Sequence, residues 1–274
     1  MIKDLKVVLK ELKGSALCCF NVFGIEDAKA VIEAAEETGK PVALSCNKTI
    51  VDYMGIKEAG LLFSTMAQKS KASVVVHLDH TYEEVQIEKA LDCGYSSFMF
   101  DGSQLPLKEN IKRTKRMADL VHQKGWSLEG EIGSVPYQEG RDHIKSLLSD
   151  PEEVAIFEKE AGVDALAISI GNIHRMSKGH CEINFKRFQE IKDRVNGTPL
   201  VIHGTTGIKE DDLIRLKEEG ISKFNIGTDL RKAFGESLRS LMSEYPNEYD
   251  RIFLLEKTIP FIKDAALRYL KILG

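Results

Sequence analysis

The sequence predicts a single (β/α)8 barrel, an α/β fold in which parallel strands alternate with helices. Eight short apolar segments start about 25–40 residues apart, which is room for one strand, one helix and their loops. Amphipathic segments with helical spacing occupy the intervals. No Gly-, Ser- or Pro-rich linker divides the chain, so residues 1–274 are predicted to form one domain.

The predicted strands are continuously apolar, as expected for strands that are covered on both faces. In chain order they are residues 16–22, 41–47, 73–79, 96–102, 126–132, 165–171, 199–204 and 223–229. The carboxyl ends of parallel strands meet at one rim of a barrel, where barrel enzymes place their active sites.

Helices are predicted between these strands, with clear examples at residues 26–40, 82–94, 150–162 and 209–220. The third begins with Asp150 as N-cap and Pro151 at the first helical position. Residues 133–151 form a longer connection than is usual after a barrel strand. Because this connection lies at the rim, we predict that it is a mobile loop that covers the site.

Composition excludes several classes of function. The formal charge of −4 argues against nucleic acid, whose recognition requires a basic face. Segment 110–124 is basic, but its helical spacing is that of a solvated helix face. No apolar run reaches the ~18–20 residues of a membrane span. Five cysteines without C-x-x-C spacing or a secretory leader predict reduced thiols and a cytoplasmic location.

Three histidines lie at or after the ends of predicted strands. His80 follows the third strand, His174 follows the sixth, and His203 lies at the end of the seventh. Three imidazoles at one rim would bind a divalent cation, most suitably Zn²⁺, and leave a coordination position open for substrate. The sequence therefore predicts a metal-dependent enzyme.

Other polar residues gather at the same rim. Asp79 either orients a metal ligand or transfers protons to and from the substrate. Asp101 and Glu131 are either donors for a displaced or second cation or part of a polar network that supports the imidazoles. Segments 203–207 (HGTTG) and 225–229 (NIGTD) offer small residues and hydroxyls where barrels commonly bind phosphate, although each alone is also typical of an ordinary turn.

These residues resemble the class II (metal-dependent) ketose-bisphosphate aldolases, the fructose- and tagatose-bisphosphate aldolase group, over essentially the whole chain. The motifs that carry the resemblance are HLDH (77–80), FDGS (100–103) followed by LP (105–106), EGEIG (129–133), GNIH (171–174), HGTTG (203–207) and KFNIGTD (223–229). Their order and spacing are more specific than any one of them.

The resemblance implies roles for the charged residues. It places the catalytic Zn²⁺ on His80, His174 and His203, and it places Asp101 and Glu131 near the alternative position of the metal. The resemblance also allows a second divalent or a monovalent cation. The acid/base group for the aldehyde oxygen would be Asp79. A glutamate eight residues beyond Glu131, which is Glu139 in the long connection, would be the base that removes the substrate proton.

The implied activity is a zinc-dependent, reversible cleavage of a ketose (bis)phosphate into dihydroxyacetone phosphate and an aldehyde, as in glycolysis and related carbohydrate metabolism. The implied partner is a small sugar phosphate, and the family suggests a homodimer or homotetramer. From their position at the rim after the second strand, Lys48 and Asn47 are expected to meet the aldehyde half. The predicted substrate-binding residues are Asn21, Asn47, Arg175, Gly204, Thr205, Thr206, Asn225, Gly227 and Thr228.

The chain departs from the family around the substrate. Arg175 stands where the family usually has Gly, Pro136-Tyr137 replaces a Gly pair in the long connection, and Thr205-Thr206 replaces a smaller pair. Arg175 either binds a phosphate or carboxylate or points to solvent. The alternatives are an aldolase-like protein for a non-bisphosphate or carboxylate-bearing sugar, and a non-catalytic sugar-phosphate binding protein. A metal-dependent hydrolase is disfavoured because the first strand carries Phe20-Asn21 and no H-x-H pair.

Overall fold

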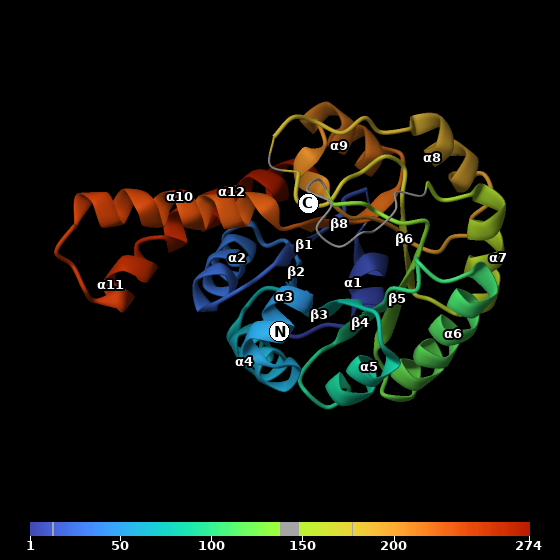
Figure 1. The fold of residues 1–274 in the computed structure, drawn as a ribbon, viewed down its shortest axis with the longest axis horizontal. Coiled ribbons are helices and arrows are strands. Elements are labelled where there is room, and N and C mark those ends of the chain that lie inside the picture. The colour runs from blue at the N-terminus through green and yellow to red at the C-terminus, as the bar shows by residue number, and fades with distance from the viewer. Residues whose placement is uncertain (13, 138–147, 177) are drawn as a thin grey trace.

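The computed structural model describes residues 1–12, 14–137, 148–176 and 178–274, and in this part of the chain it confirms the predicted barrel. Eight parallel strands close in chain order, β1 to β8, with helices around them (Figure 1). The strands are β1 (Leu17–Asn21), β2 (Val42–Cys46), β3 (Val74–Thr81), β4 (Ser97–Phe100), β5 (Ser127–Ile132), β6 (Ala165–Ile168), β7 (Leu200–Ile202) and β8 (Ile221–Ile226).

Most helices pack outside the barrel, where their apolar faces cover the outward side chains of the strands. The helices that follow β1 are α2 (Ile25–Thr38), α3 (Lys48–Met54), α4 (Ile56–Lys69), α5 (Glu84–Ala90), α6 (Leu107–Gln123), α7 (Pro151–Ala161), α8 (Phe185–Lys192), α9 (Glu210–Glu218), α10 (Thr228–Glu244), α11 (Arg251–Glu256) and α12 (Ile259–Leu273). Of these, α11 has no buried residue. As predicted, the Asp150 side chain caps α7, accepting from the backbone N–H groups of Glu152 and Glu153.

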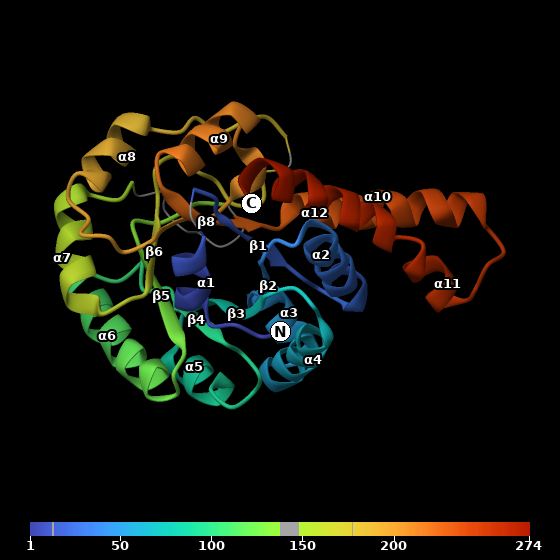
Figure 2. The same cartoon turned by 180° about the vertical axis from the view of Figure 1, so that it is seen from behind.

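The amino-terminal end of the barrel is closed by α1 (Leu5–Glu11), which lies across it in Figure 2. The inward residues at this end are apolar, and Leu5, Val8 and Leu9 of α1 pack against them. The barrel side of this cluster consists of Leu17, Cys19, Ala43, Val75, Met99, Ala165, Ala167 and Val201. In the part of the chain that the structure describes, this end is filled, which leaves the carboxyl end of the barrel for a site.

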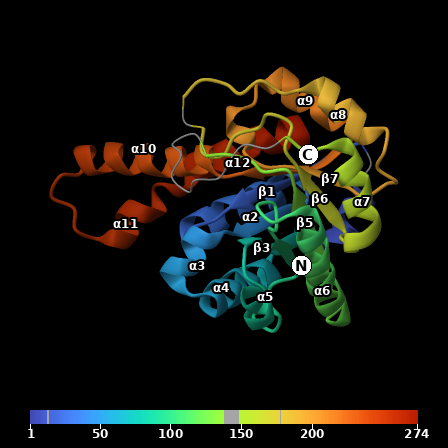
Figure 3. The same cartoon turned by 45° about the vertical axis from the view of Figure 1, so that its right-hand side comes forward.

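The C-terminal helices form an extension. α10 begins directly after β8 and, with α11, projects away from the barrel, whereas α12 returns beside α2 (Figures 1 and 3). Among the described residues, no helix combines the length and the apolar character needed to cross a bilayer.

Several strand ends differ from the prediction. β6 stops at Ile168, so His174 lies on the connection after the strand and not at its end. β3 continues through His80 to Thr81, with an irregular register between Leu78 and Thr81. β8 ends at Ile226 because the next residues begin α10. Ten residues of the predicted mobile loop, 138–147, lie outside the described residues, and Glu139 is one of them.

Candidate functional site

A cavity of about 580 Å³ opens at the carboxyl rim of the barrel. Asp79, His80 and His174 line it, as do all nine residues that were predicted to bind substrate. The other lining residues are Lys48, Thr49, Asp52, Tyr82, Gln104, Tyr137 and Arg231. Of the predicted metal ligands, His203, Asp101 and Glu131 are buried beside this cavity.

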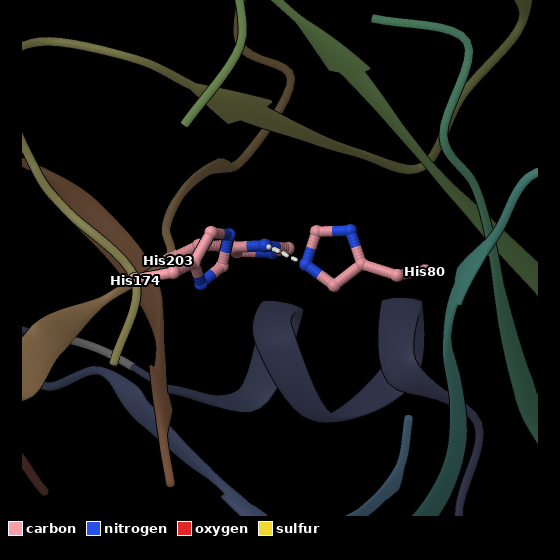
Figure 4. Close-up of side chains that lie close together, drawn as sticks. All are labelled: His80, His174 and His203. Carbon is pink, nitrogen blue, oxygen red and sulfur yellow. Dashed lines mark hydrogen bonds between the residues drawn. The ribbon is translucent and has the colours of Figure 1, made fainter. Parts of the chain in front are cut away.

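The three histidines converge, as predicted. Nitrogen atoms of His80, His174 and His203 all lie within 4.8 Å of one another. The Nε2 atom of His80 is 2.9 Å from the Nδ1 atom of His203 (Figure 4). The ring centroids of His80 and His174 are 5.1 Å apart. Three imidazoles this close together are a group that could hold one divalent cation.

Local backbone geometry places these rings. His80 has a positive φ of 50° at the irregular end of β3. His174 is held by its N–H, which donates to the Pro136 carbonyl over 2.8 Å. Gly204 follows His203 with a φ of 70°, and a Cβ atom there would clash with the carbonyl of Ile173. Glycine is therefore required where the two connections meet.

Two of the histidine rings lie within hydrogen-bond distance of a carboxylate through the nitrogen that faces away from the other ring. An Asp101 oxygen lies 2.8 Å from His80 Nδ1, and a Glu129 oxygen lies 2.9 Å from His203 Nε2. Ligating histidines commonly donate their second N–H to a carboxylate in this way. In this arrangement Asp101 supports an imidazole, which was one of its two predicted roles.

The donor set fits a cation. The buried Oε2 atom of Glu131 has no hydrogen-bond partner among the described residues, and it lies 3.7 Å from His203 Nδ1. Burial and the nearby carboxylate of Asp101 raise the pKa of Glu131 well above its usual value. A bound cation would give this oxygen a partner and would favour the ionised form of Glu131. Glu131 and Asp101 also form a second group with His80, in which all ligand atoms lie within 4.8 Å of one another.

Asp79 lies beside the imidazoles on β3 and is buried. Its two oxygens accept hydrogen bonds of 3.1 Å from the amides of Asn21 and Asn225. Burial alone would raise the pKa of this carboxyl, but neighbouring His80 and His203 lower it well below its usual range. Asp79 is therefore held as a carboxylate and can accept a proton.

A polar network beneath Asp79 was not predicted. Buried Lys223 donates to Asn225 Oδ1 over 2.7 Å and to Glu129 Oε2 over 2.8 Å. Glu129 also bonds to His203, so the network links the support of Asp79 to that of a histidine. The network could have been predicted from the alternation of side chains along a strand. Lys223 shares the inward face of β8 with Asn225, and Glu129 shares the inward face of β5 with Glu131.

The turns after β7 and β8 meet at the cavity. The first is the short helix η1 (Thr205–Gly207), and the second is the start of α10 at Thr228. The buried Oγ1 atom of Thr205 lacks a hydrogen-bond partner within the described part of the chain. Hydroxyls and the free N–H groups at a helix start suit a phosphate.

Arg175 does not simply point to solvent. It is half-buried, its guanidinium lies 5.1 Å from the centre of the Tyr137 ring, and Nη2 lies 3.2 Å from Thr49 Oγ1. The Tyr137 ring stacks on His174 at 4.8 Å between centroids. This stack could not be predicted from the sequence, because it depends on the path of two connections.

Comparison with known proteins is consistent with this geometry. The family model described as "Fructose-bisphosphate aldolase class-II" matches residues 4–274. The chain is 33% identical to the 6-phospho-5-dehydro-2-deoxy-D-gluconate aldolase of Bacillus licheniformis, over 99% of this chain and 94% of that protein. It is 34% identical to the fructose-bisphosphate aldolase of Geobacillus stearothermophilus, over 90% and 88%. The crystal structure of the YdjI aldolase from Escherichia coli K12 superposes with a TM-score of 0.86 and 30% identity, over 100% of this chain and 98% of that one.

Proposed function

The chain belongs to the class II fructose-bisphosphate aldolase family and is an aldolase, and on this premise we propose that it cleaves a ketose phosphate reversibly into dihydroxyacetone phosphate and an aldehyde, with zinc as the cation. The observation that carries the proposal is the convergence of His80, His174 and His203 beside the carboxylate of Asp79. A divalent cation held by these imidazoles would withdraw electrons from the ketose carbonyl and stabilise the negative charge that cleavage leaves.

Asp79 is proposed as the group that accepts the proton of the substrate's C4 hydroxyl during cleavage. Its two amide donors, Asn21 and Asn225, fix the carboxylate without satisfying every lone pair, so a hydroxyl can still donate to it. As the proton moves to Asp79, the bond between C3 and C4 breaks and the aldehyde leaves. In the condensation direction the same carboxyl returns the proton.

Glu139 is proposed, from the family resemblance alone, to return a proton to the three-carbon fragment and so release dihydroxyacetone phosphate. It lies outside the described residues. The mobile loop at 133–151 that would carry it remains a prediction.

The phosphate of dihydroxyacetone phosphate is proposed to bind at the turns after β7 and β8. The hydroxyl of Thr205, the residues around Gly204 and Gly227 and the amino-terminal end of α10 support this placement. Asn225, which reaches Asp79, would contact the reacting end of the substrate. A homodimer or homotetramer and a cytoplasmic location stay predictions.

The names of the relatives refer to different substrates, so the proposal does not specify the aldehyde. The test is a cleavage and condensation assay with dihydroxyacetone phosphate and a panel of aldehydes, before and after dialysis against a chelator. We expect activity to disappear on chelation and to return with Zn²⁺ or Co²⁺. Binding of dihydroxyacetone phosphate without turnover of any aldehyde would favour the non-catalytic alternative.

A further inference from the structure

We propose that Tyr137 is a positioning residue for the metal site, whose ring holds the imidazole of His174 and so slows the loss of the cation. This inference rests on the proposed function, in which His174 is one of three ligands of a divalent cation. In this role Tyr137 acts through the histidine and does not bind the cation itself. Tyr137 lines the cavity, and the function proposed above gives it no part.

The three proposed ligands are not held equally. His80 and His203 are buried, and each has a carboxylate within hydrogen-bond distance of one ring nitrogen. His174 is half-buried and lies on a connection, six residues beyond the end of β6. Among the residues that the structure describes, no carboxylate pairs with a nitrogen of His174. The position of this ligand therefore depends on contacts of another kind.

Backbone contacts bring Tyr137 beside His174. The N–H of His174 donates to the carbonyl of Pro136 over 2.8 Å. Tyr137 and His174 face each other in an isolated parallel bridge, so the connection after β5 runs beside the connection after β6 at this point. The two rings stack, with centroids 4.8 Å apart and planes inclined by 23°. An aromatic pair at this separation is attractive beyond the apolar area that it buries.

The stack leaves the coordinating edge of the imidazole free. The nitrogen lone pair of a histidine lies in the plane of its ring, so a cation approaches the edge of the ring and not its face. The rings of His80 and His203 meet that of His174 at 74° and 64°, and neither covers its face. Within the described ranges, Tyr137 is thus the ring that stacks on this ligand.

The ring of Tyr137 is restrained in turn. The guanidinium of Arg175 lies 5.1 Å from the ring centre, a separation at which a cation is attracted to an aromatic face. Nη2 of Arg175 donates to Thr49 Oγ1 over 3.2 Å, which ties the guanidinium to α3. Tyr137 is therefore held both through its backbone and through its ring.

These contacts bear on how the cation is lost. A cation held by three protein ligands leaves after one ligand turns away and water takes its place, and the ligand with the fewest restraints turns first. That ligand is His174, and its rotation would break the stack with Tyr137. A ligand held in place before the cation arrives also loses less side-chain freedom on binding. Removal of the Tyr137 ring should therefore speed the release of the cation.

The test measures zinc release from the loaded protein into an excess of a chromophoric chelator. Tyr137→Ala should release zinc about 2- to 10-fold faster than the native protein, which is the effect of losing one aromatic pair. Tyr137→Phe keeps the ring and should release zinc at close to the native rate. Tyr53→Ala is the matched control, because it removes a tyrosine of α3 that is 85% exposed, and it should also leave the rate unchanged.

Two further measurements separate this effect from damage to the fold or to the ligand set. The cation-free Tyr137 variants should unfold in urea at the native midpoint. With saturating Co²⁺, Tyr137→Ala should keep the native visible absorption, since all three histidines remain. If the alanine variant does not fold, Tyr137→Leu makes the same comparison, because leucine keeps the apolar bulk without an aromatic face.

Three outcomes would count against these proposals in different ways. Zinc release at the native rate from Tyr137→Ala overturns the inference and leaves the aldolase proposal standing. Equally fast release from Tyr137→Phe and Tyr137→Ala assigns the effect to the hydroxyl and also overturns the inference. A native protein that retains no zinc, or that retains zinc equally well after His174→Ala, refutes the metal site and with it the proposed function.

Discussion

The Nε2 atom of His203 lies 2.9 Å from a carboxylate oxygen of Glu129, at a point inside the barrel where neither side chain reaches solvent. If Nε2 carries the proton, Nδ1 is left as an acceptor, and this atom faces His80. Glu129 therefore orients a proposed metal ligand without contacting the cation's position itself.

Replacing Glu129 with Gln should weaken zinc binding by about 10- to 100-fold, as is typical for partners that orient a ligating histidine. Zinc affinity would be measured by competition with a chromophoric chelator. Glu58→Gln, on the exposed start of α4, is the control and should bind zinc as the native protein does. Native affinity in Glu129→Gln would show that this carboxylate does not tune the site.

Asp79→Ala should lower kcat by roughly 10²- to 10⁴-fold, because it removes the proposed proton acceptor. Zinc content should stay close to that of the native protein, since the hydrogen bonds of Asp79 are to Asn21 and Asn225 and not to a proposed metal ligand. Steady-state kinetics and metal analysis of the same preparation check both parts. Undiminished turnover would remove Asp79 from the mechanism.

Glu139→Gln should slow the exchange of a carbon-bound proton of dihydroxyacetone phosphate with solvent, because the amide cannot accept that proton at neutral pH. The exchange is followed by NMR in D₂O without aldehyde, so it reports on this step alone. Asp79→Ala is the informative comparison, since it should retain exchange. Exchange at the native rate in Glu139→Gln would assign the step to another base.

Asp164 supports the barrel far from the site, at the amino-terminal side of β5 and β6. Burial opposes its ionisation, but hydrogen bonds from Lys6, His122 and the Leu128 N–H lower its pKa below the usual value. A carboxyl whose folded pKa is lowered stabilises the protein above the unfolded pKa of ~3.9, and this contribution disappears as the pH falls through the folded pKa.

Asp164→Asn should therefore reduce the free energy of unfolding by about 1–3 kcal/mol near neutral pH. The difference in unfolding free energy between this variant and the native protein should become smaller at acidic pH. Urea denaturation at several pH values measures this difference. Asp119→Asn, in an exposed pair with Lys115, should change stability by less than ~0.5 kcal/mol. If the difference in unfolding free energy did not change with pH, the ionised carboxylate of Asp164 would not be the source of the stabilisation.

Strand periodicity is the reason why so much of the site could be predicted. His77 and Asp79 share the inward face of β3, and the carboxyl ends of parallel strands meet at one rim, so residues distant in sequence could be expected together. The same rule would have found Lys223 and Glu129, since both alternate with residues that were predicted.

Residues on connections could not be placed by this rule. His174 lies six residues beyond the end of β6, and the stack of Tyr137 between its ring and Arg175 depends on backbone that has no period. Arg231 lies on a helix whose start was interpreted as the end of a strand. It contacts Phe23 because the closed barrel brings the segment after β8 next to the segment after β1.

If His80, His174 and His203 hold one divalent cation, cobalt substitution should reveal them, because the visible absorption of Co²⁺ reports the number and type of its ligands. We expect one Co²⁺ per chain with the strong absorption of low coordination, and a weakened or altered spectrum when any of the three histidines is replaced with Ala. An unchanged spectrum and affinity in all three variants would contradict this assignment.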